Sequence, residues 1–161
     1  MLRELLIKKK SSIVDKWIQL IFESYPEGTS EFLKSQKDRF SNPVGHIISG
    51  TAVKLFDEII NGSGNTEKIK SMLYDFIRLR AVQDFLPSEA ADIIFSLKKV
   101  LYKELEKEIG EEKLFNEFIK LESQLDEIIL VSFDLYMEAR EKVFQIRVNE
   151  VKSRSAQKIA D

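Results

Sequence analysis

Residues 111–161 read EEKLFNEFIKLESQLDEIILVSFDLYMEAREKVFQIRVNEVKSRSAQKIAD, a stretch that contains neither proline nor glycine. Apolar residues recur through it at helical spacing, so we expect one uninterrupted helix. At a rise of 1.5 Å per residue, about 40 helical residues would extend roughly 60 Å. A compact domain of this size is shorter than that. Part of the helix must therefore protrude or pair with another helix.

The character of this helix changes along its length. Residues 128–137 are apolar on most faces, as in a central core helix or a self-associating helix. Beyond Ala139 the sequence is charged, yet apolar residues continue where little of the domain remains to cover them. These residues are Val143, Phe144, Ile146, Val148 and Val151. An exposed apolar strip of this kind usually binds a partner, and a frayed, solvated tail is the alternative.

The rest of the chain also follows helical spacing, and strand alternation is almost absent. Asn42 is a preferred N-cap residue and stands before Pro43 at a first helical position. Thr66 and Ser88 are further N-cap candidates, and the glycine-rich loop at 61–64 should end the helix before it. The predicted helices cover residues 2–22 (as one helix or two), 30–40 after a turn at 25–28, 43–60, 66–80, 88–110 and 111 onward. The predicted fold class is all-α.

The size and charge of the chain exclude several classes of partner. Its 161 residues suit one domain with a single core. Its 25 Lys and Arg nearly balance its 27 Asp and Glu, so the sequence predicts no nucleic-acid partner and no attraction to an anionic membrane. The most apolar run, residues 128–133, is far shorter than the roughly 20 residues that span a bilayer. The N-terminus also lacks the order of a secretory signal. We expect a cytoplasmic protein that does not insert into membranes.

The residues that most enzymes and metal sites need are scarce. Cysteine is absent and His46 is the only histidine, which excludes thiol nucleophiles and metal sites that need two imidazoles in one chain. His46 lies early in the chain, unlike the usual proximal histidine of a globin, so we expect a packed or surface residue and no haem ligand. Residues 62–68 lack the glycine and the preceding strand of a phosphate loop. The sequence therefore predicts no enzyme, no metal and no cofactor.

Residues 78–88 hold the densest mixture of polar and apolar side chains. Arg78 and Arg80 end a helix, where positive charge complements the helix dipole, and Gln83 and Asp84 lie at the turn that follows. Two interpretations stay open. The segment is a structural corner stabilised by an ion pair between Asp84 and Arg80, or it is a surface for a ligand or partner.

Stretches along nearly the whole chain resemble one known family. They are LIKKK (6–10), IVDKW (13–17), KDRF (37–40), NPVG (42–45), IRLRAVQDF (77–85), PS (87–88), FDLY (133–136), REK (140–142) and RVNEV (147–151). With these residues the chain resembles the N-terminal domain of RsbRD-type RsbT co-antagonists, the sensory module of a group of bacterial stress-signalling proteins.

The resemblance implies an all-α, haem-free, globin-like bundle of about six helices with a long C-terminal helix, by analogy with the related RsbR sensors, which form dimers. Residues 1–145 would be the sensor domain, and residues 146–161 would be the helix that leads into a STAS domain. In co-antagonists the STAS domain carries the phosphorylated residues and captures RsbT, which releases a stress sigma factor. This chain stops at Asp161, so we expect either a chain cut before STAS or a stand-alone copy.

Two functional hypotheses follow. The first is a non-enzymatic regulatory domain that acts through homodimerisation and contacts with an unidentified regulatory protein. Its candidate ligand or partner surface comprises Phe40, Asn42, Pro43, Arg78, Arg80, Gln83, Asp84 and Phe85. Its candidate dimer or output helix comprises Tyr136, Val143, Phe144, Arg147 and Val151. The second hypothesis is a small-molecule sensor, for an apolar ligand in preference to haem, with a pocket between helices. The candidate lining residues are Trp17, Phe40, Phe76 and Phe85.

Overall fold

The computed structural model describes residues 1–62 and 64–160, and these residues form helices and no strand. Ser63, in the predicted glycine-rich loop, and Asp161, at the end of the predicted last helix, lie outside them. The helices are α1 (Leu2–Glu23), α2 (Glu27–Ser35), α3 (Pro43–Asn61), α4 (Thr66–Val82), α5 (Pro87–Leu105) and α6 (Glu112–Ala160). The all-α prediction is confirmed, and the arrangement is compatible with the globin-like bundle that the resemblance implies.

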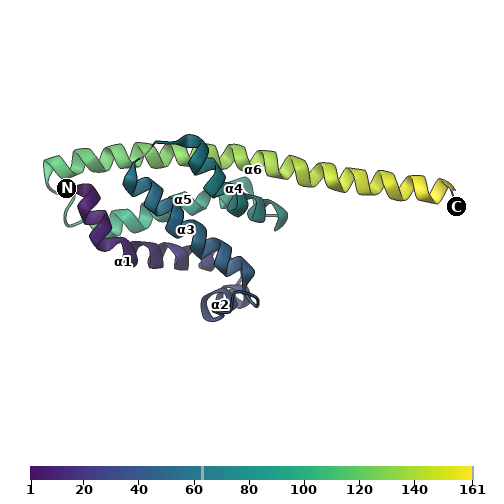
Figure 1. Ribbon diagram of the computed structural model, residues 1–161, viewed down its shortest axis with the longest axis horizontal. Coiled ribbons are helices and arrows are strands. Elements are labelled where there is room, and N and C mark those ends of the chain that lie inside the picture. Colours follow the sequence, from purple (N-terminus) through teal and green to yellow (C-terminus); the bar gives the residue numbers. More distant parts are fainter. Residues whose placement is uncertain (63, 161) are drawn as a thin grey trace.

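The helices form a small body and one long arm (Figure 1). The first part of α6 packs against α4 and α5, and α1 packs against α3 and α5. α2 contacts α1 and α3. At the other end of the body, the backbone N–H of Leu2 donates to Glu117 Oε2 at 2.8 Å and holds the start of α1 against α6. The C-terminal part of α6 extends alone, well beyond the other helices (Figure 1).

α6 confirms the prediction of a long, uninterrupted C-terminal helix. It contains 49 residues, which correspond to roughly 70 Å at the standard helical rise. Ala139 is the last residue of α6 that is buried. Beyond it only a few side chains are half-buried, and residues 149–160 are exposed. The helix therefore leaves the body close to residue 140.

Apolar side chains from α1, α3, α4, α5 and α6 fill the core. Trp17 and Phe76 are among the largest fully buried side chains, and the indole N–H of Trp17 donates to the carbonyl of Ile93 at 2.8 Å. The cavity beside them measures about 10 Å³, which is about the space that one water molecule needs. Phe40 lies on the loop between α2 and α3 with 92% of its surface exposed. The predicted pocket of Trp17, Phe40, Phe76 and Phe85 is therefore wrong, because two members are core residues and a third is on the surface.

The start of α3 follows the predicted cap. Asn42 Oδ1 accepts from the backbone N–H of Gly45 at 2.9 Å, and Pro43 occupies the first helical position. The Asn42 amide also donates to the carbonyls of Leu33 and Gln36, at 3.2 and 2.9 Å. A Cβ on residue 45 would come within 2.3 Å of the Asn42 side chain, so glycine is required there. Asn42 thus joins α2 to α3.

α2 differs from its prediction at both ends. The sequence predicted a turn at residues 25–28 and a helix over 30–40, but the helix covers Glu27–Ser35. Pro26 has an extended ψ and precedes the first turn, so the helix begins earlier than predicted. After Ser35 the chain turns around Asp38, which accepts from the Ser41 hydroxyl at 2.7 Å. This local side-chain bond competes with helix continuation.

Two predicted N-caps are wrong by one or two positions. Asn65 and not Thr66 caps α4, because its side chain accepts from the backbone N–H of Lys68. α5 begins at Pro87, one residue before the predicted cap Ser88. There the Glu89 carboxylate accepts from the backbone N–H of Leu86 at 2.6 Å. Residues 106–111 form turns, so α5 ends before the predicted Gly110.

Candidate functional site at the α4–α5 corner

The turn between α4 and α5 has an unusual backbone. Asp84 adopts a φ of 59°, the only positive φ of a non-glycine residue in the part of the chain that the structure describes. The backbone N–H of Phe85 donates to the Arg80 carbonyl at 3.2 Å and closes the end of α4. Aspartate tolerates the left-handed region better than most residues, but the conformation still needs support from its surroundings.

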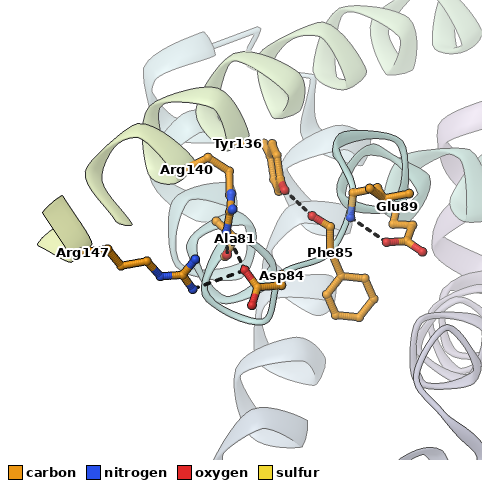
Figure 2. Close-up of polar contacts among 8 residues, drawn as sticks. Ala81, Asp84, Phe85, Glu89, Tyr136, Arg140 and Arg147 are labelled. Carbon is orange, nitrogen blue, oxygen red and sulfur yellow. Dashed lines mark hydrogen bonds and ion pairs between the residues drawn. The ribbon is translucent and has the colours of Figure 1, made fainter. Parts of the chain in front are cut away.

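That support comes from α6 (Figure 2). Arg140 Nη1 donates to Asp84 Oδ1 at 2.8 Å and to the carbonyl of Ala81 at 2.9 Å. Arg147 Nη2 lies 3.4 Å from the same Asp84 oxygen. The Tyr136 hydroxyl donates to the Phe85 carbonyl. We call these contacts of Tyr136, Arg140 and Arg147 with the corner the α6 clamp.

The α6 clamp determines which residues pair with Asp84 and favours the charged form of its carboxyl group. The expected ion pair between Asp84 and Arg80 is wrong, because Asp84 pairs with Arg140 and Arg147. The hydrogen bond from Arg140, together with the positive charge of Arg147, lowers the pKa of the Asp84 carboxyl below its ordinary value. Burial raises the pKa of the Tyr136 hydroxyl. Asp84 is therefore anionic and Tyr136 is a neutral donor at neutral pH.

The two arginines at the end of α4 have opposite environments. Arg78 is exposed, whereas Arg80 is 1% exposed. The guanidinium carbon of Arg80 lies 4.1 Å from the ring centre of Phe85, 5.0 Å from that of Tyr25 and 5.3 Å from that of Phe76. Burial lowers the pKa of the Arg80 guanidinium. We call this environment the Arg80 cage.

A groove of about 630 Å³ lies at the surface of the corner. Its lining residues come from the α1–α2 turn, α2, the α4–α5 turn and the first turn of α5: Ser24, Tyr25, Pro26, Thr29, Gln83, Asp84, Phe85 and Glu89. The Tyr25 hydroxyl donates to Gln83 Oε1 at 2.9 Å across it. The rings of Tyr25 and Phe85 meet edge to face with their centres 5.3 Å apart. The structure thus brings the predicted residues Gln83, Asp84 and Phe85 together in one groove.

The other predicted surface residues lie elsewhere. Phe40 and Pro43 line a separate pocket of about 470 Å³ with Arg39, His46 and Ile47. Asn42 is 3% exposed and serves as the N-cap of α3. The sequence therefore grouped residues from two places in the fold.

The predicted output residues lie on two neighbouring sides of α6, which differ by roughly 100° around the helix axis. Tyr136 is buried against the body and Val143 is half-buried on the same side. Phe144 and Val151 are exposed, and Arg147 reaches back to Asp84. Large apolar side chains that are 45–68% exposed share the side of Phe144. We call them the outward face of α6: Leu130, Phe133, Met137, Phe144 and Val151.

The described residues offer neither a membrane span nor a metal-binding cluster. In residues 1–62 and 64–160, no helix is long and apolar enough to cross a membrane. The same residues contain no group of three or more His, Cys, Asp or Glu side chains placed to hold a metal ion.

Comparison with known proteins relates this geometry to a family. The family described as RsbT co-antagonist protein rsbRD N-terminal domain matches residues 11–151. The chain belongs to this family. The matched region of this RsbRD N-terminal domain includes the corner, the Arg80 cage, the α6 clamp and the outward face through Val151. It is therefore a regulatory stress-signalling domain of the RsbT co-antagonist type. No curated protein and no solved structure matches the chain.

Proposed function

We propose that this RsbRD N-terminal domain is a non-enzymatic signal-input domain that acts through homodimerisation and protein contacts, with α6 as its output helix. The observation that carries the proposal is the outward face of α6. It begins on the part of α6 that packs on the body and continues onto the protruding arm. Exposed apolar side chains that continue along one helix face favour pairing with another helix.

The spacing of the outward face supports a second copy as the partner. Leu130, Met137, Phe144 and Val151 are seven residues apart, and each is more than half exposed. A left-handed coiled coil has apolar residues at two positions of each seven-residue repeat, and each of them packs into the facing helix. The four residues fill one of these positions, and Phe133 fills the other in the first repeat. We place the two helices parallel and in register, so that every residue of the repeat meets its own copy. In this arrangement both arms leave the bodies at the same end.

The α6 clamp connects the corner to this output helix. Tyr136 and Arg140 lie on either side of Ala139, where α6 leaves the body. Arg147 lies about two helical turns further along the arm than Arg140, and its interaction with Asp84 extends the contact to that point. A change in the corner therefore acts on α6 at the base of the arm. We propose residues 1–145 as the sensor domain and residues 146–161 as the connection to the output.

The partner downstream is a regulatory protein, by analogy with the RsbT co-antagonists that give the family its name. Action without catalysis, in the cytoplasm and without nucleic acid, stays a prediction from the sequence. A second candidate function is small-molecule sensing. The groove at the corner favours it, since the groove borders both the Arg80 cage and the α6 clamp.

Light scattering coupled to gel filtration tests the dimer, with Phe144→Glu as the main variant. Phe144 is 65% exposed, so pairing would bury roughly 130 Å² of it and contribute about 3 kcal/mol per copy. We expect the wild type to be a dimer at tens of micromolar. The variant should dimerise at least about 100-fold more weakly and be mostly monomeric at that concentration. Gln145→Glu places the same charge on the next, exposed residue and should leave the dimer intact. A monomeric wild type, or equal effects of the two variants, would contradict the proposal.

A further inference from the structure

The Arg80 guanidinium is buried without a bound carboxylate. Its Nη2 donates to the Ser24 hydroxyl at 2.8 Å, and that hydroxyl donates to the Ile21 carbonyl. Its Nε and Nη1 have no hydrogen-bond partner among the described residues, although they carry most of the N–H donors of an arginine. Asp92 and Glu89 act on the guanidinium only through space. The Arg80 cage thus holds a cation in which two of the three guanidinium nitrogens lack an acceptor among the described residues.

The surroundings of Arg80 only partly offset the cost of burying a charge. Moving an ion into a protein interior is unfavourable unless a partner of opposite charge and further hydrogen bonds satisfy it. The rings of Tyr25, Phe76 and Phe85 attract the cation through their faces, but they accept no conventional hydrogen bond. A helix that needed only a positive charge near its C-terminus could use an exposed arginine, as it does at Arg78. An anionic group would supply what the cage lacks.

The groove at the corner adjoins this cation. Ser24, Tyr25 and Phe85 line the groove and also contact the Arg80 guanidinium, so these three side chains form the wall between them. The two carboxylates that line the groove are already engaged. Asp84 is bound by Arg140 and Arg147, and Glu89 accepts from the backbone N–H of Leu86. Neither neutralises Arg80.

We propose that the corner binds a small organic carboxylate, whose charged group pairs with Arg80 and whose apolar part lies in the groove against Tyr25 and Phe85. This inference rests on the proposed function and gives the signal its chemical class. A carboxylate fits better than a phosphate because Arg80 supplies a single positive charge, and the acidic side chains of the groove would repel a dianion. The Tyr25 and Phe85 rings and Pro26 offer apolar contact for the rest of the molecule.

The site is connected to the output helix by the residue that covers it. The ring of Phe85 lies over the guanidinium, and the carbonyl of Phe85 accepts from the Tyr136 hydroxyl on α6. A carboxylate that reaches Arg80 must displace part of the wall of Ser24, Tyr25 and Phe85. Binding therefore acts on the α6 clamp through the Phe85 backbone.

Nuclear magnetic resonance of the full chain tests this proposal with defined probes. Phenylacetate is titrated into the ¹⁵N-labelled protein, with phenylacetamide as its neutral analogue and inorganic phosphate as a second anion. We expect phenylacetate to shift the Arg80 side-chain Nε–H signal and the amides of residues 83–86 in a saturable way. Phenylacetamide should shift neither. No saturable shift, an equal response to the amide, or a response to phosphate alone would overturn the inference.

Two arginine variants make a matched pair. Arg80→Met should weaken phenylacetate binding by roughly tenfold or more, because one charge-assisted interaction is lost. Arg78→Met, which removes an exposed arginine of the same helix, should bind as the wild type does. If Arg80→Met fails to fold, the response of the Arg80 Nε–H signal in the wild-type protein still tests the proposal. Light scattering on the same samples separates the two proposals: an intact dimer without binding overturns only the carboxylate site, and binding by a monomer overturns only the proposed function.

Discussion

Tyr136→Phe isolates the contact between the corner and the output helix. The substitution removes only the hydroxyl that donates to the Phe85 carbonyl and leaves the buried ring in place. A hydrogen bond of this kind contributes about 1 kcal/mol to the free energy of unfolding. In the variant the Phe85 carbonyl loses this donor, but Phe85 is only half-buried, so water can take the donor's place. We therefore expect the free energy of unfolding to fall by about 1 kcal/mol and the melting temperature by about 2–4 °C.

Urea unfolding, followed by the fluorescence of the single, buried Trp17, measures the change in stability. Hydrogen exchange locates it, and we expect faster exchange in residues 83–89 and near residue 140, with the core of α3 unchanged. Tyr102→Phe makes the same chemical change at a tyrosine that is 62% exposed on α5 and should be neutral. Stability within about 0.3 kcal/mol of the wild type, or exchange that speeds up everywhere, would refute the reasoning that this bond holds the corner to α6.

Two further substitutions test the roles of predicted site residues. Asn42→Ala removes a helix cap and two amide hydrogen bonds, so it should cost about 2–4 kcal/mol of unfolding free energy in the same urea assay; a loss below about 1 kcal/mol would contradict a structural role for Asn42. Asp84→Asn should reveal the pH dependence of the α6 clamp. The folded-state pKa of Asp84 is lowered, so the stabilisation from its charge is present above its unfolded pKa and is lost as the pH falls through the folded pKa. The stability difference between wild type and variant should therefore be constant above about pH 5 and shrink in more acidic solution; a difference that does not depend on pH would exclude this role.

The helices were predictable where the signal is local. Asn42 before Pro43 identified the start of α3, and the stretch without proline or glycine identified α6, because capping and chain breaking depend on neighbouring residues. The same local rules gave Thr66 and Ser88 as caps, each close to a true helix start. At α4 the adjacent Asn65 supplies the cap in place of Thr66, and α5 begins at Pro87, after Leu86, which has no capping side chain. The exact first residue of a helix depends on backbone geometry, which the residue types alone do not determine.

The site was predictable only in part because its contacts are distant in sequence. Asp84 has an arginine four residues earlier, and this spacing suggested an ion pair with Arg80. Its actual partner Arg140 lies 56 residues away and reaches it only because α6 packs against α4. Sequence periodicity carries no information on which helices become neighbours. The contributions of Ser24 and Tyr25 to the Arg80 cage were missed for the same reason.

The two sides of α6 show a further limit of prediction from the sequence. The sequence indicated an apolar strip beyond Ala139 but could not separate residues that pack on the body from residues that face outward. Val143 is half-buried on the body side, whereas its neighbour Phe144 is 65% exposed. One residue rotates the helix by roughly 100°, so adjacent apolar residues can serve different contacts. Only the position of the body assigns each residue to its side.

The pairing of two α6 helices through their outward faces is tested most directly by disulfide cross-linking. The chain has no cysteine, so a single introduced cysteine gives an unambiguous readout. Val151→Cys places the thiol on the outward face, and Glu150→Cys places it on an exposed position of another face. We predict that mild oxidation converts Val151→Cys rapidly to a covalent dimer and Glu150→Cys much more slowly. Equal rates for the two variants, or no covalent dimer from Val151→Cys, would contradict the account.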